Sequence, residues 1–418
     1  MKKQIVVVLL SFCVSLLFSG CNIGNSAVSE TQGDSDKNKD NITLMHVNAD
    51  KAGVQEYIEN AEKKLNMKIN LISPPANAYN RQAEISTLLS SGDPSVDVIT
   101  INDEMISEFK HKGYLEAIDD TVMTQEIIDC YPSEYMNKMV MKDSRVYSVP
   151  YTLDIMALWA NADVIKKAGI DRISDRKDFE KLLNASFENG VYGYGGSWEA
   201  TYAYNEILQF INMFGGDYQN WSNTSTREAM RFLHDVYKNH RIAEDVLFDQ
   251  YEQLEQKFMN GDYGNIFMYS GITNTFLKAG MYGEDKIHVV PLPRFEEKAT
   301  NVGSWQYVLN KGSKNKDAAK KFLAYAAGRE GSIDYSNAMK QLPARLDIIE
   351  DGGLDIPDID IWKDYVKDVK LKARPLSDDP MMKIEKIGLL FQKYVTDEIT
   401  LDEFCDRAGE IVEIGRAS

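Results

Sequence analysis

Between residues 42 and 101 the sequence alternates between short strand-like runs and segments with a helical apolar period. Ile42–Val47 and Val96–Ile101 are apolar enough for buried strands, and Met67–Ile72 alternates as a strand does. Val54–Leu65 has its apolar residues at helical spacing, and Tyr79–Leu89 predicts a second helix. Strand, helix, strand, helix, strand at this spacing predicts a parallel α/β sheet with right-handed crossovers.

The same kind of pattern returns after a central, mainly helical region. Further strands are expected at 145–150, 155–159, 263–269, 287–291 and 305–309, and further helices at 163–168, 226–240, 252–259, 317–327 and over most of 380–414. A chain of 418 residues exceeds the size at which one hydrophobic core stops growing. We therefore expect two α/β lobes.

The N-terminus predicts export from the cytoplasm. Met1-Lys2-Lys3 precedes an apolar run over 5–18, which is too short for a membrane-spanning helix and typical of a signal peptide. Ser19-Gly20-Cys21 resembles a bacterial lipobox, which implies a signal peptide at 1–20 and a lipid on Cys21. Residues 21–41 would then be a polar tether to the extracytoplasmic side of a bacterial membrane, at the cell surface or in the periplasm. The alternative is a plain secretory signal with an incidental cysteine.

Charge and motif content point to a binding protein. A net charge of −17 argues against a nucleic-acid partner, which requires a basic footprint. The sequence has no phosphate-binding loop, no G-x-S-x-G elbow and no H-E-x-x-H, and its five histidines are scattered. The glycines at 193–196 fit a turn beside an aromatic site better than a phosphate cradle. Cys130 and Cys405 suit neither a disulfide framework nor a zinc site, so we expect no metal and no cofactor.

Five segments, in order, resemble the extracellular solute-binding proteins of bacterial carbohydrate ABC importers, the maltose-binding-protein-like family 1. They are Val96–Asp119 with its Lys112-Gly113-Tyr114-Leu115 turn, Val146–Ile170, Phe258–Gly271, Pro291–Ala319 and Leu342–Arg345. The resemblance extends over residues 42 to 418.

This resemblance implies a class II periplasmic-binding-protein-like fold with a hinge between the lobes. The N-terminal lobe would comprise 42–152 plus 292–338, and the C-terminal lobe 153–291 plus 339–418. The implied function is to capture a sugar, an oligosaccharide, in the cleft between the lobes and deliver it to the transmembrane subunits of an ABC permease, with the chain acting as a monomer. One alternative keeps the fold but binds an amino acid, peptide, polyamine or chelate. Another is a surface glycoside hydrolase, which would require a pair of catalytic carboxylates.

Ligands of such sheets bind at the carboxyl ends of strands, so the residues that follow the strands are the candidates. The predicted ligand-binding residues are Asp50, Lys51, Asn102, Asp103, Glu104, Tyr151, Asp154, Trp198, Tyr269, Ser270, Trp305 and Arg345. Asp50, Lys51, Asp154 and Trp305 match family positions that contact sugars. Trp198 lies in a glycine-flanked loop, where an exposed indole could stack on a pyranose ring.

Each candidate also has a purely structural interpretation. Asp50 and Lys51 suit a solvated turn, and a helix N-cap explains one residue of 102–104. Tyr151 suits hinge packing, and the two tryptophans suit a core. Arg345 suits a structural salt bridge as well as a bidentate contact to a ligand.

Overall fold

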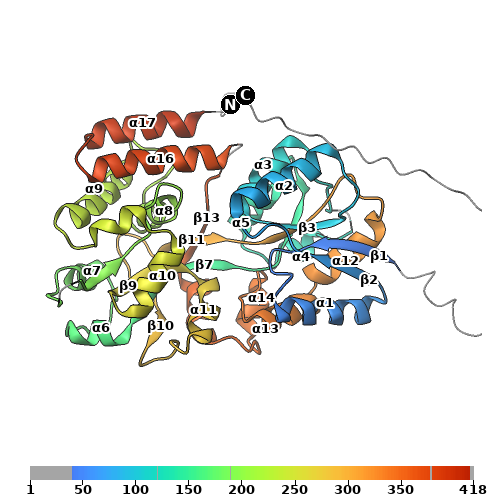
Figure 1. Cartoon of the computed structure of the whole chain (residues 1–418), viewed down its shortest axis with the longest axis horizontal. Coiled ribbons are helices and arrows are strands. Elements are labelled where there is room, and N and C mark those ends of the chain that lie inside the picture. The colour runs from blue at the N-terminus through green and yellow to red at the C-terminus, as the bar shows by residue number, and fades with distance from the viewer. Residues whose placement is uncertain (1–39, 120, 189, 377–378, 415–418) are drawn as a thin grey trace, which may run out of the picture. The chain divides into compact units, whose positions relative to one another are not determined.

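The computed structural model describes residues 40–119, 121–188, 190–376 and 379–414, and its main strands form two sheets (Figure 1). The first sheet has the order β2 (Lys68–Ile72), β1 (Asn41–Met45), β3 (Val98–Ile101), β12 (Gln306–Leu309) and β6 (Ser148–Pro150). Strand β1 is parallel to β2 and to β3, which confirms the predicted parallel βαβαβ unit. Strand β12 comes from much later in the chain and is antiparallel to both β3 and β6.

The second sheet is built around the long strand β7. Its order is β13 (Lys370–Ala373), β11 (Ala299–Gly303), β7 (Asp154–Asn161), β9 (Tyr263–Tyr269) and β8 (Tyr192–Gly195), with β10 (Ile287–Val290) pairing with β7. All residues of β7 after Asp154 are buried. Its Trp159 packs on Trp362 and Phe276, so the second sheet has its own aromatic core.

Helices cover both sheets. The first sheet and its helices form what we call the first lobe, with α1 (Ala52–Leu65), α2 (Ala78–Ser91), α3 (Asp103–Lys112), α4 (Gln125–Ile128), α5 (Ser133–Tyr135), the π-helix η1 (Met136–Val140), the hairpin β4 (Met141–Lys142) and β5 (Arg145–Val146), α12 (Lys316–Ala327) and α13 (Arg329–Met339). The second lobe has α6 (Ala162–Lys167), α7 (Arg176–Leu183), α8 (Ala203–Met213), α9 (Thr224–Lys238), η2 (Glu244–Phe248), α10 (Tyr251–Asn260), η3 (Ser270–Ile272), α11 (Thr273–Lys278), α15 (Ile359–Asp368), α16 (Pro380–Val395) and α17 (Leu401–Glu413). Between them, α14 (Leu346–Asp351) packs against α15.

The glycine-rich segment at 192–196 differs from the prediction. Tyr192–Gly195 is not a turn but strand β8, parallel to β9. A Cβ on Gly193 would lie 2.2 Å from the carbonyl oxygen of Leu182, and a Cβ on Gly195 would lie 2.2 Å from the ring of Tyr263. The glycines are therefore required for close packing in a buried strand, a role that a turn-like composition does not reveal.

The predicted lobe boundaries also need correction. Residues 292–303 were assigned to the first lobe, but β11 pairs with β7 and β13 in the second sheet. Conversely, Arg345 and Leu346 were assigned to the second lobe, yet they bond to Ala327 and Cys130 of the first. β11 belongs to the second sheet because it pairs with β7 and β13, and a local sequence pattern carries no information about that pairing.

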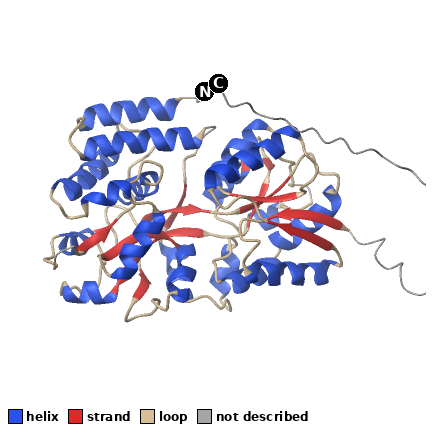
Figure 2. Ribbon diagram, in the orientation of Figure 1, coloured by secondary structure: helices blue, strands red, loops and turns tan. Residues whose placement is uncertain are grey.

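The chain crosses between the sheets at 151–153 and at 304–305, and it returns to the second lobe after Leu346, in the stretch that leads to α15 (Figure 2). The crossings at 151–153 and 304–305 are hydrogen-bonded to each other and to Leu342. The Tyr151 N–H donates to the Trp305 carbonyl at 3.0 Å, the Trp305 N–H to Thr152 Oγ1 at 3.2 Å, and the Leu153 N–H to the Leu342 carbonyl at 2.9 Å. The two crossings and the segment at Leu342 form one connected hinge.

Both cysteines within the described ranges carry free thiols. Cys130 is partly exposed and Cys405 is buried. No helix in the described part of the chain combines the length and apolar character needed to cross a membrane. Cys21 and the predicted signal peptide lie outside the described residues.

Candidate functional site

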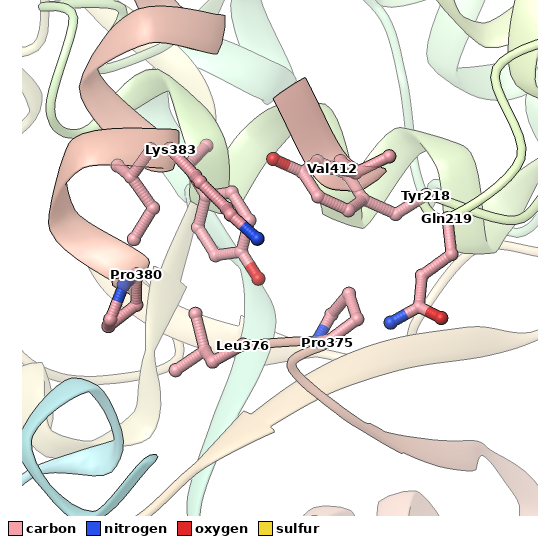
Figure 3. A pocket seen from close by; sticks show the side chains of 9 residues that line it. Tyr218, Gln219, Pro375, Leu376, Pro380, Lys383 and Val412 are labelled. Atoms are coloured by element: carbon pink, nitrogen blue, oxygen red, sulfur yellow. The ribbon is translucent and has the colours of Figure 1, made fainter. Parts of the chain in front are cut away.

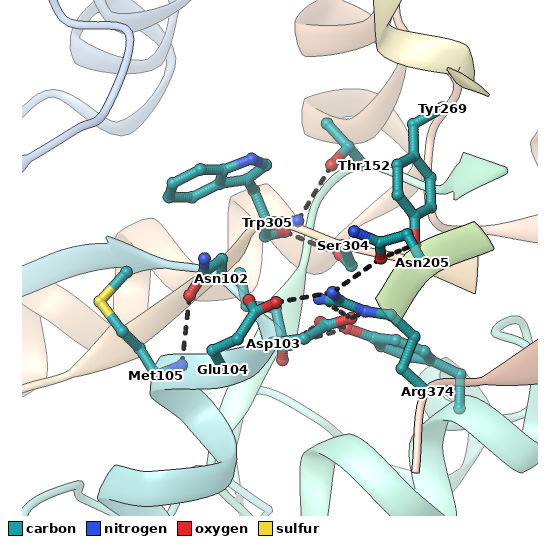
Figure 4. Close-up of polar contacts among 12 residues, drawn as sticks. Asn102, Asp103, Glu104, Met105, Thr152, Asn205, Tyr269, Ser304, Trp305 and Arg374 are labelled. Atoms are coloured by element: carbon teal, nitrogen blue, oxygen red, sulfur yellow. Dashed lines mark hydrogen bonds and ion pairs between the residues drawn. The ribbon is translucent and has the colours of Figure 1, made fainter. Parts of the chain in front are cut away.

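Polar side chains from both lobes meet beside the hinge (Figure 4). On the first lobe, Asp103 and Glu104 form the first turn of α3, directly after β3. On the second lobe, Arg374 follows β13, and Asn205 lies on α8. These elements bring together residues that are far apart in the sequence, at the ends of strands where the prediction located the site.

Asp103 is the buried centre of this group, with no exposed surface. Its Oδ1 accepts hydrogen bonds from the Tyr135 hydroxyl and, at 3.1 Å, from Gln306 Nε2. Its Oδ2 accepts from Arg374 Nη2 at 3.2 Å and from Arg374 Nε at 3.4 Å. The carboxylate therefore has partners on both oxygens, as a buried charge requires.

Arg374 is held by groups of both lobes. Its Nη1 donates to Glu104 Oε1 at 2.6 Å and to Asn205 Oδ1 at 3.4 Å. The Tyr269 hydroxyl donates to the same Asn205 oxygen at 3.0 Å. A Cβ on Gly303 would lie 3.4 Å from Asp103 Oδ2 and 4.0 Å from Arg374 Nε. The ion pair therefore packs against the end of β11, next to the crossing at 304–305.

Burial and charge act in opposite directions on these groups. Burial raises the pKa of Asp103 to about 6, although Arg374 pulls it down and Glu104 raises it further. Burial lowers the pKa of Arg374, but Glu104, Tyr269 and Asp103 together raise it by more, so it lies well above its ordinary value. The guanidinium is therefore a permanent cation facing two acidic groups.

A second carboxylate lies at the start of β7. Asp154 Oδ1 accepts from Ser270 Oγ at 3.0 Å and from the Gly271 N–H at 2.8 Å. Burial raises the pKa of Asp154, while these two hydrogen bonds and Arg374 lower it. Ser270 is itself buried and also bonds to the Leu153 carbonyl at 3.3 Å, so it orients Asp154 against the hinge.

An aromatic surface lies on the hinge itself. Trp305 is half-buried, and the Arg81 guanidinium of α2 lies over its ring at 5.6 Å from the centroid. Arg81 Nη1 donates to the Ala76 carbonyl at 2.9 Å, which fixes the guanidinium over the indole. On the second lobe, Tyr202 and Tyr251 pack edge to face, with centroids 4.8 Å apart. Their rings and the indole are the amphipathic type of surface that stacks on ligands.

Three predicted residues lie at helix starts on the first lobe. Asn102 caps α3, because its side chain accepts from the Met105 N–H at 3.2 Å. Asp50 and Lys51 are exposed in the turn between β1 and α1. Their contact with a ligand stays a prediction.

Three other predicted residues are placed away from any open surface. Trp198 is fully buried against Phe391 and Tyr237 in the core of the second lobe, so the expectation of an exposed stacking indole is corrected. Tyr151 is buried on Tyr307, with centroids 4.3 Å apart, which supports its hinge-packing interpretation.

Arg345 is the third. It pairs with Asp347 at 2.8 Å and donates to the Ala327 carbonyl at 3.1 Å and to Cys130 Sγ at 3.2 Å. This is the structural salt bridge that the sequence left open. These contacts support the structural interpretation of Arg345, and its contact with a ligand stays a prediction.

The sequence missed four residues that the fold brings to the site: Arg374, Asn205, Arg81 and Gln306. Arg374 follows the lysine-rich strand β13, which the sequence does not predict. Asn205 lies on α8, which the sequence does not distinguish from the rest of the central helical region. The only available signal was the Arg374-Pro375 step, since proline ends a strand and leaves the preceding side chain at its terminus.

The second lobe also contains a separate pocket. This pocket is lined by Tyr204, Tyr218, Gln219, Pro375, Leu376, Pro380, Lys383, Ile384 and Val412 (Figure 3). The charged groups at the hinge are not among these lining residues. Among the residues described between 40 and 414, no group of three or more histidine, cysteine or acidic side chains is placed to hold a metal ion.

Comparison with known proteins gives a consistent family pattern. The family model for bacterial extracellular solute-binding proteins matches residues 47–333. The chain is 22% identical over 346 residues to the arabinooligosaccharide-binding protein of Bacillus subtilis, covering 79% of this chain and 77% of that protein. It is 23% identical over 296 residues to a probable amino-acid ABC transporter periplasmic-binding protein of Sinorhizobium fredii, covering 66% of each.

Solved structures share the two-lobe fold. Maltose-bound MalE3 of T. maritima superposes with a TM-score of 0.72 at 18% identity, over 90% of this chain and 99% of that one. An ABC substrate-binding protein of Listeria monocytogenes in complex with cycloalternan gives a TM-score of 0.73 at 18% identity, over 91% and 100%. These likenesses confirm the predicted α/β two-lobe architecture.

Proposed function

Because the chain belongs to the family of bacterial extracellular solute-binding proteins, we propose that it captures a sugar between its lobes and delivers it to the membrane permease of an ABC importer. The sugar we propose is an oligosaccharide. The arabinooligosaccharide-binding proteins of Bacillus subtilis and Halalkalibacterium halodurans support this assignment, as do the structural neighbours with bound maltose and cycloalternan. In this proposal the protein binds and releases its cargo, and no bond is made or broken.

The observation that carries the proposal is the pairing of polar and aromatic groups beside the hinge. Glu104, Asp154 and Tyr269 offer directional hydrogen-bonding groups on both lobes, and Trp305 offers a half-exposed ring. Hydroxyl-rich ligands need this combination, because the polar groups fix orientation while an aromatic face covers the apolar C–H surface of a sugar ring. Arg81 stiffens the indole by lying over it.

A thermal-shift panel tests the ligand class. The chain from Asn22 to Ser418 is mixed with mono- and oligosaccharides, including arabino- and malto-oligosaccharides. A ligand that binds only the folded state adds RT ln(1 + [L]/Kd), which is about 2.7 kcal/mol at a hundredfold excess over Kd. A shift with one oligosaccharide series supports the proposal, and a flat response to every sugar contradicts it.

A second arm of the panel carries amino acids. The relative in Sinorhizobium fredii, described as a probable amino-acid transporter component, gives this alternative a specific basis. A shift with amino acids alone would replace the sugar proposal while leaving the binding role intact. Incubation with sugar polymers, followed by an assay for new reducing ends, tests the hydrolase alternative, for which we expect no product.

We also propose that Cys21 carries a lipid that tethers the protein to the outer face of the cytoplasmic membrane. The support is the Ser19-Gly20-Cys21 sequence behind an apolar run. Expression of Cys21→Ser in a bacterium should release the protein from the membrane fraction, and mass spectrometry should find acyl chains only on the parent. Cys130→Ser is the matched control and should remain in the membrane fraction.

A further inference from the structure

The ion cluster at the hinge consists of two halves, one built by each lobe. On the first lobe, Asp103 is fixed by Tyr135 and Gln306, which both bond to its Oδ1. Gln306 Nε2 also lies 2.7 Å from the Tyr135 hydroxyl, and its Oε1 accepts from Ser148 Oγ. This network uses one carboxylate oxygen and leaves Oδ2 directed to the other lobe.

The second lobe builds the complementary half. Asn205 Oδ1 accepts from Arg374 Nη1 and from the Tyr269 hydroxyl. The Asn205 carbonyl in turn accepts from Asn301 Nδ2 at 2.8 Å, so α8 and β11 hold this asparagine in place. The guanidinium is therefore oriented by its own lobe before it meets an acidic group of the other.

The two halves meet at the boundary between the lobes. Arg374 reaches Asp103 at 3.2 Å and Glu104 at 2.6 Å. Lys372 of β13 lies 3.6 Å from Glu134 of α5, and these side chains are 40% and 30% exposed. Lys110 is buried on the first lobe and also interacts electrostatically with Asp103.

We propose that Arg374, Asp103 and Glu104 form a latch that favours the closed arrangement of the lobes, whether or not a solute is bound. Rotation about the crossings at 151–153 and 304–305 separates the two halves, because Arg374 belongs to the second sheet and both acidic residues belong to α3. Each half keeps its own hydrogen bonds when the lobes part. Closure therefore joins prearranged groups, which reduces the ordering cost that weakens most ion pairs.

A latch of this kind acts on the resting equilibrium between open and closed forms. A fork-shaped guanidinium facing two carboxylates makes stronger, more directional contacts than a single lysine pair. The Lys372–Glu134 pair, in contrast, contributes less, because it is one longer contact and both side chains keep part of their surface in water, which screens the charges. The two pairs therefore form a matched test, since both cross the same boundary, one from β13 and one from the residue directly after it.

The test measures lobe separation in the absence of sugar. Spin labels are placed at Glu84→Cys on α2 and Lys278→Cys on α11, both exposed, in a Cys130→Ser background of the chain from Asn22 to Ser418. Bound solutes are removed by unfolding, dialysis and refolding. We expect Arg374→Gln to shift the distance distribution towards longer separations, while Lys372→Gln leaves it unchanged.

Glu104→Gln provides the second variant. It removes one carboxylate and keeps the Asp103 pair, so it should produce a smaller shift in the same direction even if Arg374→Gln fails to fold. Unchanged distributions in the folded latch variants would overturn the proposal, as would an equal shift in Lys372→Gln. Since the samples contain no sugar, this result is independent of the panel that tests the ligand class.

Discussion

Arg374 Nη2 lies 3.2 Å from Asp103 Oδ2, and this ion pair joins the end of β13 in the second sheet to the first residue of α3 in the first lobe. The two residues are separated by 270 intervening positions, and the fold buries both. Burial of a charge is costly unless it is paired and hydrogen-bonded. The pair therefore makes each partner dependent on the other.

Removing both partners should be less destabilising than the sum of the two single removals. Arg374→Met leaves the Asp103 carboxylate buried without its cation, and we expect the free energy of unfolding to fall by about 3–5 kcal/mol. The double variant with Asp103→Asn should lose less than the sum of the two single variants, because the unpaired charge is gone. Urea unfolding of all four proteins measures this. Additive losses would contradict a direct coupling, and the partly exposed control Lys372→Met should lose at most about 1 kcal/mol.

Glu206 on α8 should make stability fall as the pH rises. Burial raises its pKa to about 8 from an ordinary 4.5, although its Oε2 accepts from the Ser197 N–H at 2.9 Å. Between these two values the folded state holds a proton that the unfolded state has lost, so each increase in pH favours unfolding. The contribution is fully present below about pH 4.5 and is lost as the pH passes the folded pKa.

Glu206→Gln replaces the titrating carboxyl by an amide and should flatten the pH dependence of the stability. A pKa shift of one unit corresponds to about 1.4 kcal/mol, so the effect is measurable in melting temperatures at pH 5 and pH 9. The drop between the two conditions should be smaller in the variant than in the parent. Glu228→Gln on α9 is an exposed control that should keep the parent's drop. An equal drop in Glu206→Gln would exclude this carboxyl as the cause.

Trp305 and Trp198 should separate binding from folding. Trp305 is half-buried at the hinge, and its replacement by alanine should weaken sugar binding, with a small effect on melting temperature. Trp198 is fully buried, and Trp198→Ala should cost about 3–5 kcal/mol of stability. Titration of the folded fraction should then give a dissociation constant close to the parent's for Trp198→Ala. If Trp198→Ala weakened sugar binding and Trp305→Ala did not, the stacking surface would lie in the loop at 196–199.

Two glycines in the C-terminal helices should respond oppositely to alanine. A Cβ on Gly388 of α16 would lie 1.8 Å from the Ala200 carbonyl oxygen, whereas a Cβ on Gly409 of α17 would lie 3.9 Å from Trp221. Gly388→Ala must push the helix off the loop before α8, and we expect a clear loss of stability. Gly409→Ala should stabilise by up to about 1 kcal/mol, because alanine is the better helix former. Thermal unfolding compares the two, and equal effects would contradict the close approach at Gly388.

Local patterns were sufficient for much of the architecture. The apolar periods of 42–101 predicted the parallel βαβαβ unit, which the register of β1 with β2 and β3 confirms. The strand at 263–269 and the helix at 317–327 were also found to within a residue. Each of these elements is buried on one face or along its whole length. Such burial produces a regular spacing of apolar residues that can be recognised within a short stretch of sequence.

The sequence alone determined the two-lobe α/β class and the position of Asp103 and Glu104 after a buried strand. Tertiary structure alone decided which side chains meet them. Arg374 comes from a short strand rich in lysine, and β11 joins the second sheet through pairing with β7. It also buried Trp198 and left Trp305 partly open. The physical reason is that exposure and charge pairing depend on partners hundreds of residues away, whereas a hydrophobic period depends on neighbours within a few turns.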